Sequence, residues 1–246
     1  MTTRLLLPVL LLLAATLQAA TIDPPVTQSE RLSADIERDL RSRPRSILPL
    51  LQLEPGDRVA DIFGGSGYYS ELIAAIVGSE GEVLLQNNAA YRAFVGEALT
   101  QRFDGRNPGR ITLLDSEAAD LQLGEAALDG ALIVMSYHDL FYDDAENGWP
   151  QIDDADFMGQ IHRALKADGR LLIVDHAAVD GSGAAAAQTL HRIDEAFVVE
   201  RLSAQGFRLV GSSPALRSPE DDRTLSVFDP AIRGRTDRFA LVFEKR

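Results

Sequence analysis

Two histidine–aspartate pairs are the side chains of this sequence best suited to acid–base chemistry. His138 and Asp139 follow the fourth predicted strand, and Asp175 and His176 end the fifth. The carboxyl ends of parallel strands meet at one edge of a sheet, where ligands bind in α/β proteins. We therefore expect one pocket, in which His138 or His176 is a general base and Asp139 is a catalytic neighbour.

A metal site is the alternative chemistry for the same edge. Asp139, Asp175 and His176 could hold a divalent cation that orients a hydroxyl group. Oxygen ligands suit Mg²⁺ or Ca²⁺, and an added imidazole shifts the preference toward a transition metal. Asp175 could equally cap the turn after its strand. We favour the acid–base interpretation, so no metal ligand is assigned and a divalent metal is the less favoured cofactor.

The remaining histidines are assigned by their predicted elements. His191 and Arg192 are expected to begin a helix and to close the same pocket. His162 lies on a helix predicted to cover the sheet, and its role is interpreted as structural.

A glycine-rich turn follows the first predicted strand. Residues 59–70 read VADIFGGSGYYS, an apolar run that ends in Asp61 and opens through Gly64, Gly65 and Gly67 into a helix. Glycine lets the backbone approach a ligand closely, and a helix N-terminus favours polar groups there. An acid at this point suits a ligand with hydroxyl or amino donors. A dinucleotide site is the less favoured alternative, because Ser70 takes the third small position and Asn87 replaces the expected acid.

The predicted elements alternate between short apolar strands and helices. This order is typical of a parallel sheet covered on both faces, in the α/β class. The last two strands are expected to form an antiparallel pair at the sheet edge. The strands are predicted at 58–62, 82–86, 111–114, 130–136, 169–175, 207–212 and 238–244, with helices at 33–51 (divided by Pro44), 157–166 and 189–205.

This arrangement resembles the class I S-adenosylmethionine-dependent methyltransferases from about residue 33 to the end of the chain, which implies their Rossmann-like doubly wound fold. Three segments are also similar to motifs of a group of predicted bacterial, exported methyltransferases. These segments are Tyr137-His138-Asp139-Leu140, Asp175-His176 and Leu190-His191-Arg192-Ile193-Asp194.

The resemblance implies S-adenosylmethionine as cofactor and an unidentified small molecule as methyl acceptor. Asp61 would lie beside the methionine part, Asn87 at the ribose and Glu117 at the adenine, with Gly64, Gly65, Gly67 and Ser136 completing the cofactor site. Methyl transfer is promoted mostly by positioning, so a base is needed only for a protonated acceptor atom. Two positions depart from the family pattern: Phe63 replaces the first glycine of the loop, and Asn87 replaces an acid.

The N-terminus and the composition limit where the protein acts and on what. Arg4, an apolar run to Leu13 and a small-residue end at Ala19-Ala20 predict a signal peptide over residues 1–20. A flexible leader over 21–32 and one domain over 33–246 would follow, in the periplasm or outside the cell. There is no cysteine, which excludes disulfides, thiol chemistry and a lipoprotein anchor. A net charge of −13 disfavours nucleic acid and anionic membranes as partners, and favours a small molecule, or a neutral or cationic partner.

Export raises a difficulty, because the periplasm has no evident supply of S-adenosylmethionine. The second hypothesis is therefore a non-catalytic exported small-molecule-binding protein on the same fold. In that protein, Phe63 and Asn87 would be substitutions that accompanied the loss of catalysis. An exported metal-dependent hydrolase is the third. Two loops, 139–156 with Tyr142 and Trp149, and 218–229, are candidate lids over the ligand.

Overall fold

The computed structural model describes residues 31–106 and 108–246. The predicted signal peptide and most of the predicted leader lie outside these residues. Among the described helices, none has the length and apolar character needed to cross a membrane.

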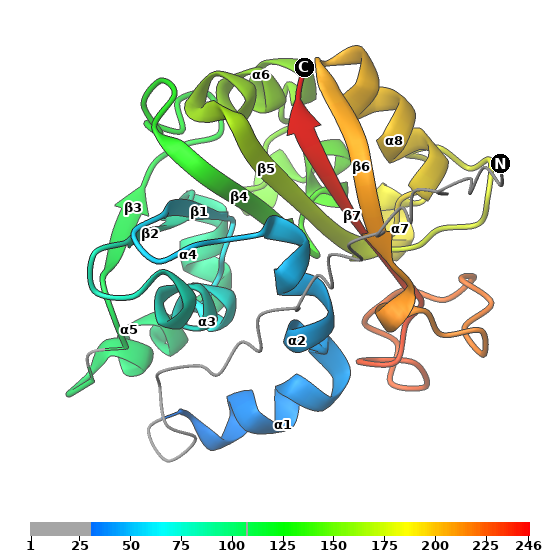
Figure 1. The fold of residues 1–246 in the computed structure, drawn as a ribbon. Helices are drawn as coiled ribbons and strands as arrows, with labels where there is room; N and C mark the ends of the chain where they lie inside the picture. The colour runs from blue at the N-terminus through cyan, green and yellow to red at the C-terminus, as the bar shows by residue number, and fades with distance from the viewer. Residues whose placement is uncertain (1–30, 107) are drawn as a thin grey trace, which may run out of the picture.

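Seven strands form one sheet in the order β3-β2-β1-β4-β5-β7-β6 (Figure 1). The strands β1 to β5 run parallel, and β7 pairs antiparallel with both β5 and β6. This confirms the α/β prediction of a mostly parallel sheet with a C-terminal antiparallel pair. The bounds are β1 Arg58–Ile62, β2 Glu82–Asn87, β3 Ile111–Asp115, β4 Leu128–Val134, β5 Leu165–His176, β6 Phe207–Ser213 and β7 Arg238–Lys245.

Helices cover both faces of the sheet, and each face has its own apolar core. One core packs α2 and α3 against inward-facing strand residues such as Val59 and Leu172. The other packs α6 and α8 against residues such as Ile62 and Ile173. The helices are α1 Ser33–Ser42, α2 Pro44–Ile47, α3 Tyr68–Val77, α4 Ala89–Val95, α5 Glu97–Phe103, α6 Asp154–Ala164, α7 Ala187–Leu190 and α8 Glu195–Ala204, with short 3₁₀ turns η1 Leu48–Leu51, η2 His138–Phe141, η3 Ala145–Asn147 and η4 Pro214–Leu216.

Two predicted elements differ from the structure, and two helices were not predicted. The helix predicted over 189–205 is broken between α7 and α8, because His191 has a left-handed backbone (φ 53°) and Asp194 caps a new helix by accepting from the Ala196 N–H. The fifth strand begins earlier than predicted, since Leu165 already pairs with Leu128 of β4. Helices α4 and α5 were not predicted.

The antiparallel β7 brings basic residues to the edge where β4 and β5 end. Because β7 runs opposite to β5, its first residue, Arg238, is paired in register with His176, the last residue of β5. The helix α1 lies below the same edge (Figure 1). The topology thus joins the ends of β4 and β5, the beginning of β7 and α1 around one space.

Candidate functional site

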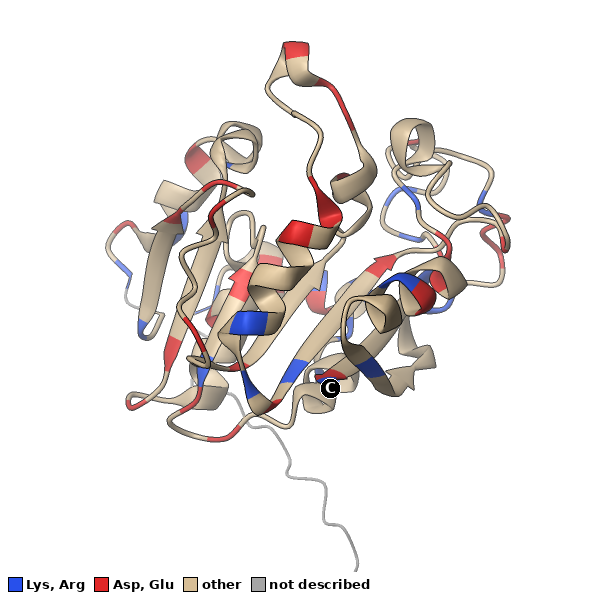
Figure 2. Cartoon of the chain, turned by 90° about the horizontal axis from the view of Figure 1, so that it is seen from above, with Lys and Arg blue, Asp and Glu red and all other residues tan. Residues whose placement is uncertain are grey.

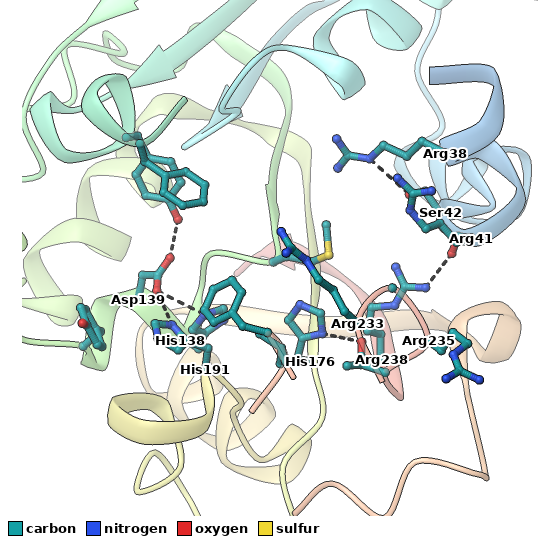
Figure 3. A pocket seen from close by; sticks show the side chains of 18 of the residues that line it. Arg38, Arg41, Ser42, His138, Asp139, His176, His191, Arg233, Arg235 and Arg238 are labelled. Carbon is teal, nitrogen blue, oxygen red and sulfur yellow. Dashed lines mark hydrogen bonds and ion pairs between the residues drawn. The ribbon is translucent and has the colours of Figure 1, made fainter. Parts of the chain in front are cut away.

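A cavity of about 1010 Å³ opens at this edge, and we call it the arginine–histidine cavity (Figure 3). It contains the three predicted catalytic residues His138, Asp139 and His176. Both predicted lids contribute to its wall, through Tyr142 and Trp149 and through Val227 and Phe228. The described residues that line it are Glu37, Arg38, Leu40, Arg41, Ser42, Tyr91, Phe94, Met135, His138, Asp139, Tyr142, Trp149, His176, His191, Val227, Phe228, Arg233, Gly234, Arg235, Thr236 and Arg238.

His138 lies between two carboxylates. Its Nδ1 is 2.8 Å from Asp175 Oδ1, and its Nε2 is 3.2 Å from Asp139 Oδ1. Asp175 is fully buried and also accepts the His138 backbone N–H at 2.9 Å. Burial alone would lower the pKa of His138, but the charges of Asp175 and Asp139 outweigh it and raise the pKa to about 10. Without another cation, His138 is therefore an imidazolium and cannot accept a proton.

Asp139 is the meeting point of three side chains. One of its oxygens accepts a hydrogen bond from the Tyr91 hydroxyl, and the other faces both His138 and His191, whose Nδ1 is 3.7 Å away. Burial would raise the pKa of Asp139, but the neighbouring His138 holds it well below its usual range. The carboxylate is ionised at neutral pH.

His176 occupies a different position from the one predicted for a metal ligand. Its Nδ1 lies 2.8 Å from the Thr236 hydroxyl, and its ring centroid is 6.1 Å from that of His138. Burial, together with the charges of His138 and Arg238, lowers its pKa well below the ordinary value. His176 is thus a neutral imidazole.

His191 and Arg192 are neighbours in the sequence but have different roles. His191 lines the cavity, with its ring centroid 4.9 Å from those of both Tyr142 and Phe228. Arg192 is fully buried behind it and binds both oxygens of Asp221, at 2.9 and 3.0 Å. Arg192 therefore supports the loop that carries Phe228 and does not line the cavity. His162 lies on α6 with its ring against Phe207, away from this site.

Five arginines form the opposite wall of the cavity (Figure 3), and this was not predicted. Arg38 and Arg41 come from α1, Arg233 and Arg235 come from the segment before β7, and Arg238 is the first residue of β7. None of the five has an Asp or Glu oxygen within ion-pair distance among the described residues. Two sequence signals existed, since three arginines lie within residues 233–238 and three more within residues 41–45.

Arg238 is the most enclosed of these arginines. It is 7 % exposed, and its Nε is buried without a hydrogen-bond partner among the described residues. One terminal nitrogen donates to the Arg41 carbonyl at 2.6 Å. Burial lowers its pKa, and the charges of Arg38 and Arg41 add to that effect. A buried cation without a counter-ion indicates a place for an anion.

The predicted cofactor residues do not line this cavity. Asp61 is buried at the end of β1, and its Oδ2 accepts the Ser70 hydroxyl at 2.6 Å. Gly64 packs on it so closely that a Cβ there would lie 2.7 Å from the Asp61 carboxyl carbon. Of the described residues in the predicted cofactor set, which are Asp61, Gly64, Gly65, Gly67, Asn87, Glu117 and Ser136, none lines the arginine–histidine cavity.

Asn87 and Phe63 make the contacts that hold the glycine loop in its conformation. The Asn87 amide accepts the Gly65 N–H at 3.0 Å and donates to the Gly65 carbonyl at 2.9 Å, and the residue is 1 % exposed. Phe63 takes a left-handed backbone (φ 52°), and its ring stacks on Tyr91 of α4 and Phe157 of α6, with centroids 4.6 and 5.2 Å away. This stack lies over the end of β1, between α4, which follows β2, and α6, which is the helix after β4.

The contacts of these residues within the protein limit the groups that they can offer to S-adenosylmethionine. The two bonds to Gly65 use one lone pair and one N–H of the Asn87 amide, so a ribose could bond only the lone pair and the N–H that remain, and Phe63 stands where the family has a glycine. Ser136 is buried, with its hydroxyl 3.4 Å from the Val134 carbonyl, and Glu117 is exposed and accepts the Ala89 N–H. In the arrangement described, Asp61, Asn87 and Ser136 are each 1 % exposed, so their polar groups bond within the protein.

The buried Asp61 makes stability depend on pH. Burial raises its pKa to about 6, and the Ser70 hydroxyl offsets this only in part. The pKa of Asp61 is higher in the native state than in the unfolded state. Its protonated carboxyl therefore makes its full contribution to the free energy of unfolding below about pH 4, and this contribution is lost as the pH rises through 6. Asp61→Asn keeps an acceptor for Ser70. Relative to the unaltered chain, it should gain about 2 kcal/mol of stability between pH 4.5 and 7.5 in urea unfolding.

The exposed aspartate variant Asp120→Asn controls for the loss of one charge in that comparison. A pH dependence that is the same in Asp61→Asn and in the unaltered chain would contradict the expectation.

Known proteins are similar to this chain in structure and not in sequence. No family model matches, and no curated protein sequence matches significantly. A S-adenosylmethionine-dependent methyltransferase from Aquifex aeolicus has a TM-score of 0.58 at 16 % identity, covering 87 % of this chain and 98 % of its own. A Burkholderia thailandensis 1,6-didemethyltoxoflavin-N1-methyltransferase has a TM-score of 0.53 at 21 % identity, and the match covers 85 % of this chain and 82 % of that one. The chain has the fold of the S-adenosylmethionine-dependent methyltransferases.

A third solved structure of this fold is an arsenic (III) S-adenosylmethionine methyltransferase from Chlamydomonas reinhardtii. Its TM-score is 0.50 at 14 % identity, and the match covers 78 % of this chain and 64 % of that one. The Burkholderia structure contains S-adenosylhomocysteine and 1,6-didemethyltoxoflavin. At such identities the fold is shared, and the chemistry of this chain must be argued from its own residues.

Proposed function

We propose that this chain is an exported protein that binds an anionic small molecule in the arginine–histidine cavity. The observation that carries the proposal is the buried Arg238, which has no carboxylate partner among the described residues and faces the same space as four other arginines. The predicted signal peptide supports export. The methyltransferase fold then serves as the scaffold of a binding site.

The distribution of charge supports an anionic ligand. The chain carries a net charge of −13, and its Asp and Glu residues are spread over the helices and loops (Figure 2). Arginines are nevertheless gathered around one cavity, in positions that a carboxylate or phosphate can bond. Tyr91, Phe94 and Trp149 line the other side, so the ligand would have an apolar or aromatic part as well.

Methyl transfer from S-adenosylmethionine to a small molecule is the second candidate function. The solved methyltransferases of the same fold support it, and one of them is described with its small-molecule ligand. The acceptor would then occupy the arginine–histidine cavity. For this chain, the cofactor would have to bond the lone pair and the N–H of Asn87 that Gly65 does not use, beside Phe63 in place of a glycine.

Calorimetric titration of the purified protein distinguishes the two candidates. The probes are S-adenosylmethionine, S-adenosylhomocysteine, inorganic phosphate, citrate and phenyl phosphate. We expect phenyl phosphate to bind more tightly than inorganic phosphate, and S-adenosylmethionine not to bind. Arg41→Ala should weaken anion binding about 10- to 100-fold, because one charge-assisted bond is lost.

Arg110→Ala is the matched control, since Arg110 is exposed and does not line the cavity. It should leave anion binding unchanged. Micromolar binding of S-adenosylmethionine that Asp61→Ala weakens, with no binding of the anions, would overturn the proposal in favour of the methyltransferase. Equal losses in Arg41→Ala and Arg110→Ala would also contradict it.

A further inference from the structure

We propose that His138, Asp139 and His191 form a binding site for one divalent transition-metal ion in the wall of the arginine–histidine cavity. This site is distinct from the trio considered from the sequence, which was Asp139, Asp175 and His176. It does not depend on the anionic ligand proposed above, since its ligands are protein side chains alone.

The distances between the three side chains suit a single ion. One nitrogen of each histidine and one oxygen of Asp139 lie within 4.8 Å of one another. The Asp139 Oδ1 is 3.2 Å from His138 Nε2 and 3.7 Å from His191 Nδ1. An ion bonded at about 2.0–2.2 Å to each ligand places neighbouring ligand atoms about 3.0–3.5 Å apart. Binding would therefore require only small side-chain shifts.

Asp175 fixes which nitrogen of His138 faces this site. A carboxylate can only accept, so the His138 Nδ1 carries the proton that it donates to Asp175. The Nε2 lone pair then points at the Asp139 carboxylate, and two acceptors at 3.2 Å need a cation between them. That cation is either a second proton on the imidazole or a metal ion. A carboxylate behind a ligating histidine is the usual support of a metal site.

The other two ligands are also held in place. The Tyr91 hydroxyl donates to the second oxygen of Asp139, which leaves Oδ1 for the ion. His191 stands at the left-handed end of α7, and its ring lies between Tyr142 and Phe228. His191 and His138 meet nearly edge to face, with centroids 5.4 Å apart. These contacts direct three donors from two chain segments at one point.

The donor set indicates the kind of ion. Two imidazole nitrogens and one carboxylate oxygen suit Zn²⁺, Co²⁺, Mn²⁺ or Fe²⁺ better than Mg²⁺ or Ca²⁺, which prefer oxygen. All three residues line the cavity, so a bound ion would have further coordination positions open toward it. The ion would then be accessible to a small-molecule ligand.

The test is a titration of the metal-stripped protein, carrying no polyhistidine tag, with Co²⁺ followed by visible absorption and with Zn²⁺ followed by calorimetry. We expect one ion per chain, visible Co²⁺ bands from nitrogen and oxygen ligands, and no competition by Mg²⁺. His191→Asn, which tolerates the left-handed backbone, should lower Zn²⁺ affinity at least 10-fold and change the Co²⁺ bands. Asp175→Asn should lower affinity about 10- to 100-fold through the orientation of His138.

His162→Asn is the matched control, because His162 lies on α6 outside the cavity, and it should bind Zn²⁺ like the unaltered chain. Circular dichroism checks that each variant folds, and Asp139→Asn replaces His191→Asn if that variant does not. The proposal is overturned if neither ion binds, or if His191→Asn and Asp139→Asn bind Zn²⁺ as tightly as the control. Anion binding measured without metal tests the proposed function separately.

Discussion

The Arg238→Met variant is expected to be more stable than the unaltered protein and to bind anionic ligands at least 10-fold more weakly. Arg238 is 7 % exposed, has a buried Nε without a partner among the described residues, and lies in the field of Arg38 and Arg41. Methionine has a similar length and no charge. Removing an uncompensated buried charge should therefore add about 1–2 kcal/mol to the free energy of unfolding.

The opposite signs of the two effects make this prediction specific. A residue kept only for packing would lose stability on substitution, whereas a ligand-binding residue can be retained at a cost in stability. Urea unfolding gives the first quantity, and titration with phenyl phosphate gives the second. Arg208→Met, which removes an exposed ion pair with Glu244, should change neither by much. A destabilised Arg238→Met with unchanged anion binding would contradict the assignment.

Arg102→Met is expected to lower the free energy of unfolding by about 3–5 kcal/mol, because it leaves a buried carboxylate without its partner. Arg102 is 3 % exposed and bonds Asp35 at 2.6 Å and Glu71 at 2.7 Å. It also donates to the Ser66 carbonyl. Glu71 keeps a second partner in Arg106, so the loss falls mainly on Asp35.

This network also positions the cavity, since Asp35 lies on α1 one turn before Arg38. Arg102→Met should therefore weaken anion binding as well as stability. The double variant Asp35→Asn/Arg102→Met should recover part of the lost stability, because it removes the unpaired charge. Urea unfolding of both variants measures the difference. A loss below about 1 kcal/mol in Arg102→Met would show that Asp35 finds solvent or another partner.

The architecture and the edge on which the site lies follow from local patterns in the sequence. Short apolar strands alternating with helices predicted the parallel sheet, and the late pair of strands predicted the antiparallel addition, because burial on both faces leaves a strong local pattern. Since that pattern also shows where each strand ends, it was enough to place His138, Asp139 and His176 at one edge of the sheet.

The contacts that those side chains make depend on the tertiary structure. The pairing of His138 with Asp175 joins two strands, and the approach of His191 requires the break between α7 and α8. The arginine wall joins α1 to residues almost 200 positions later, through the antiparallel return of β7. In the same way, Asn87 and Phe63 could be recognised as unusual in the sequence, but their contacts with Gly65 and Tyr91 could not. Such contacts depend on packing between segments that are distant in the sequence, and the local periodicity of the sequence does not show that packing.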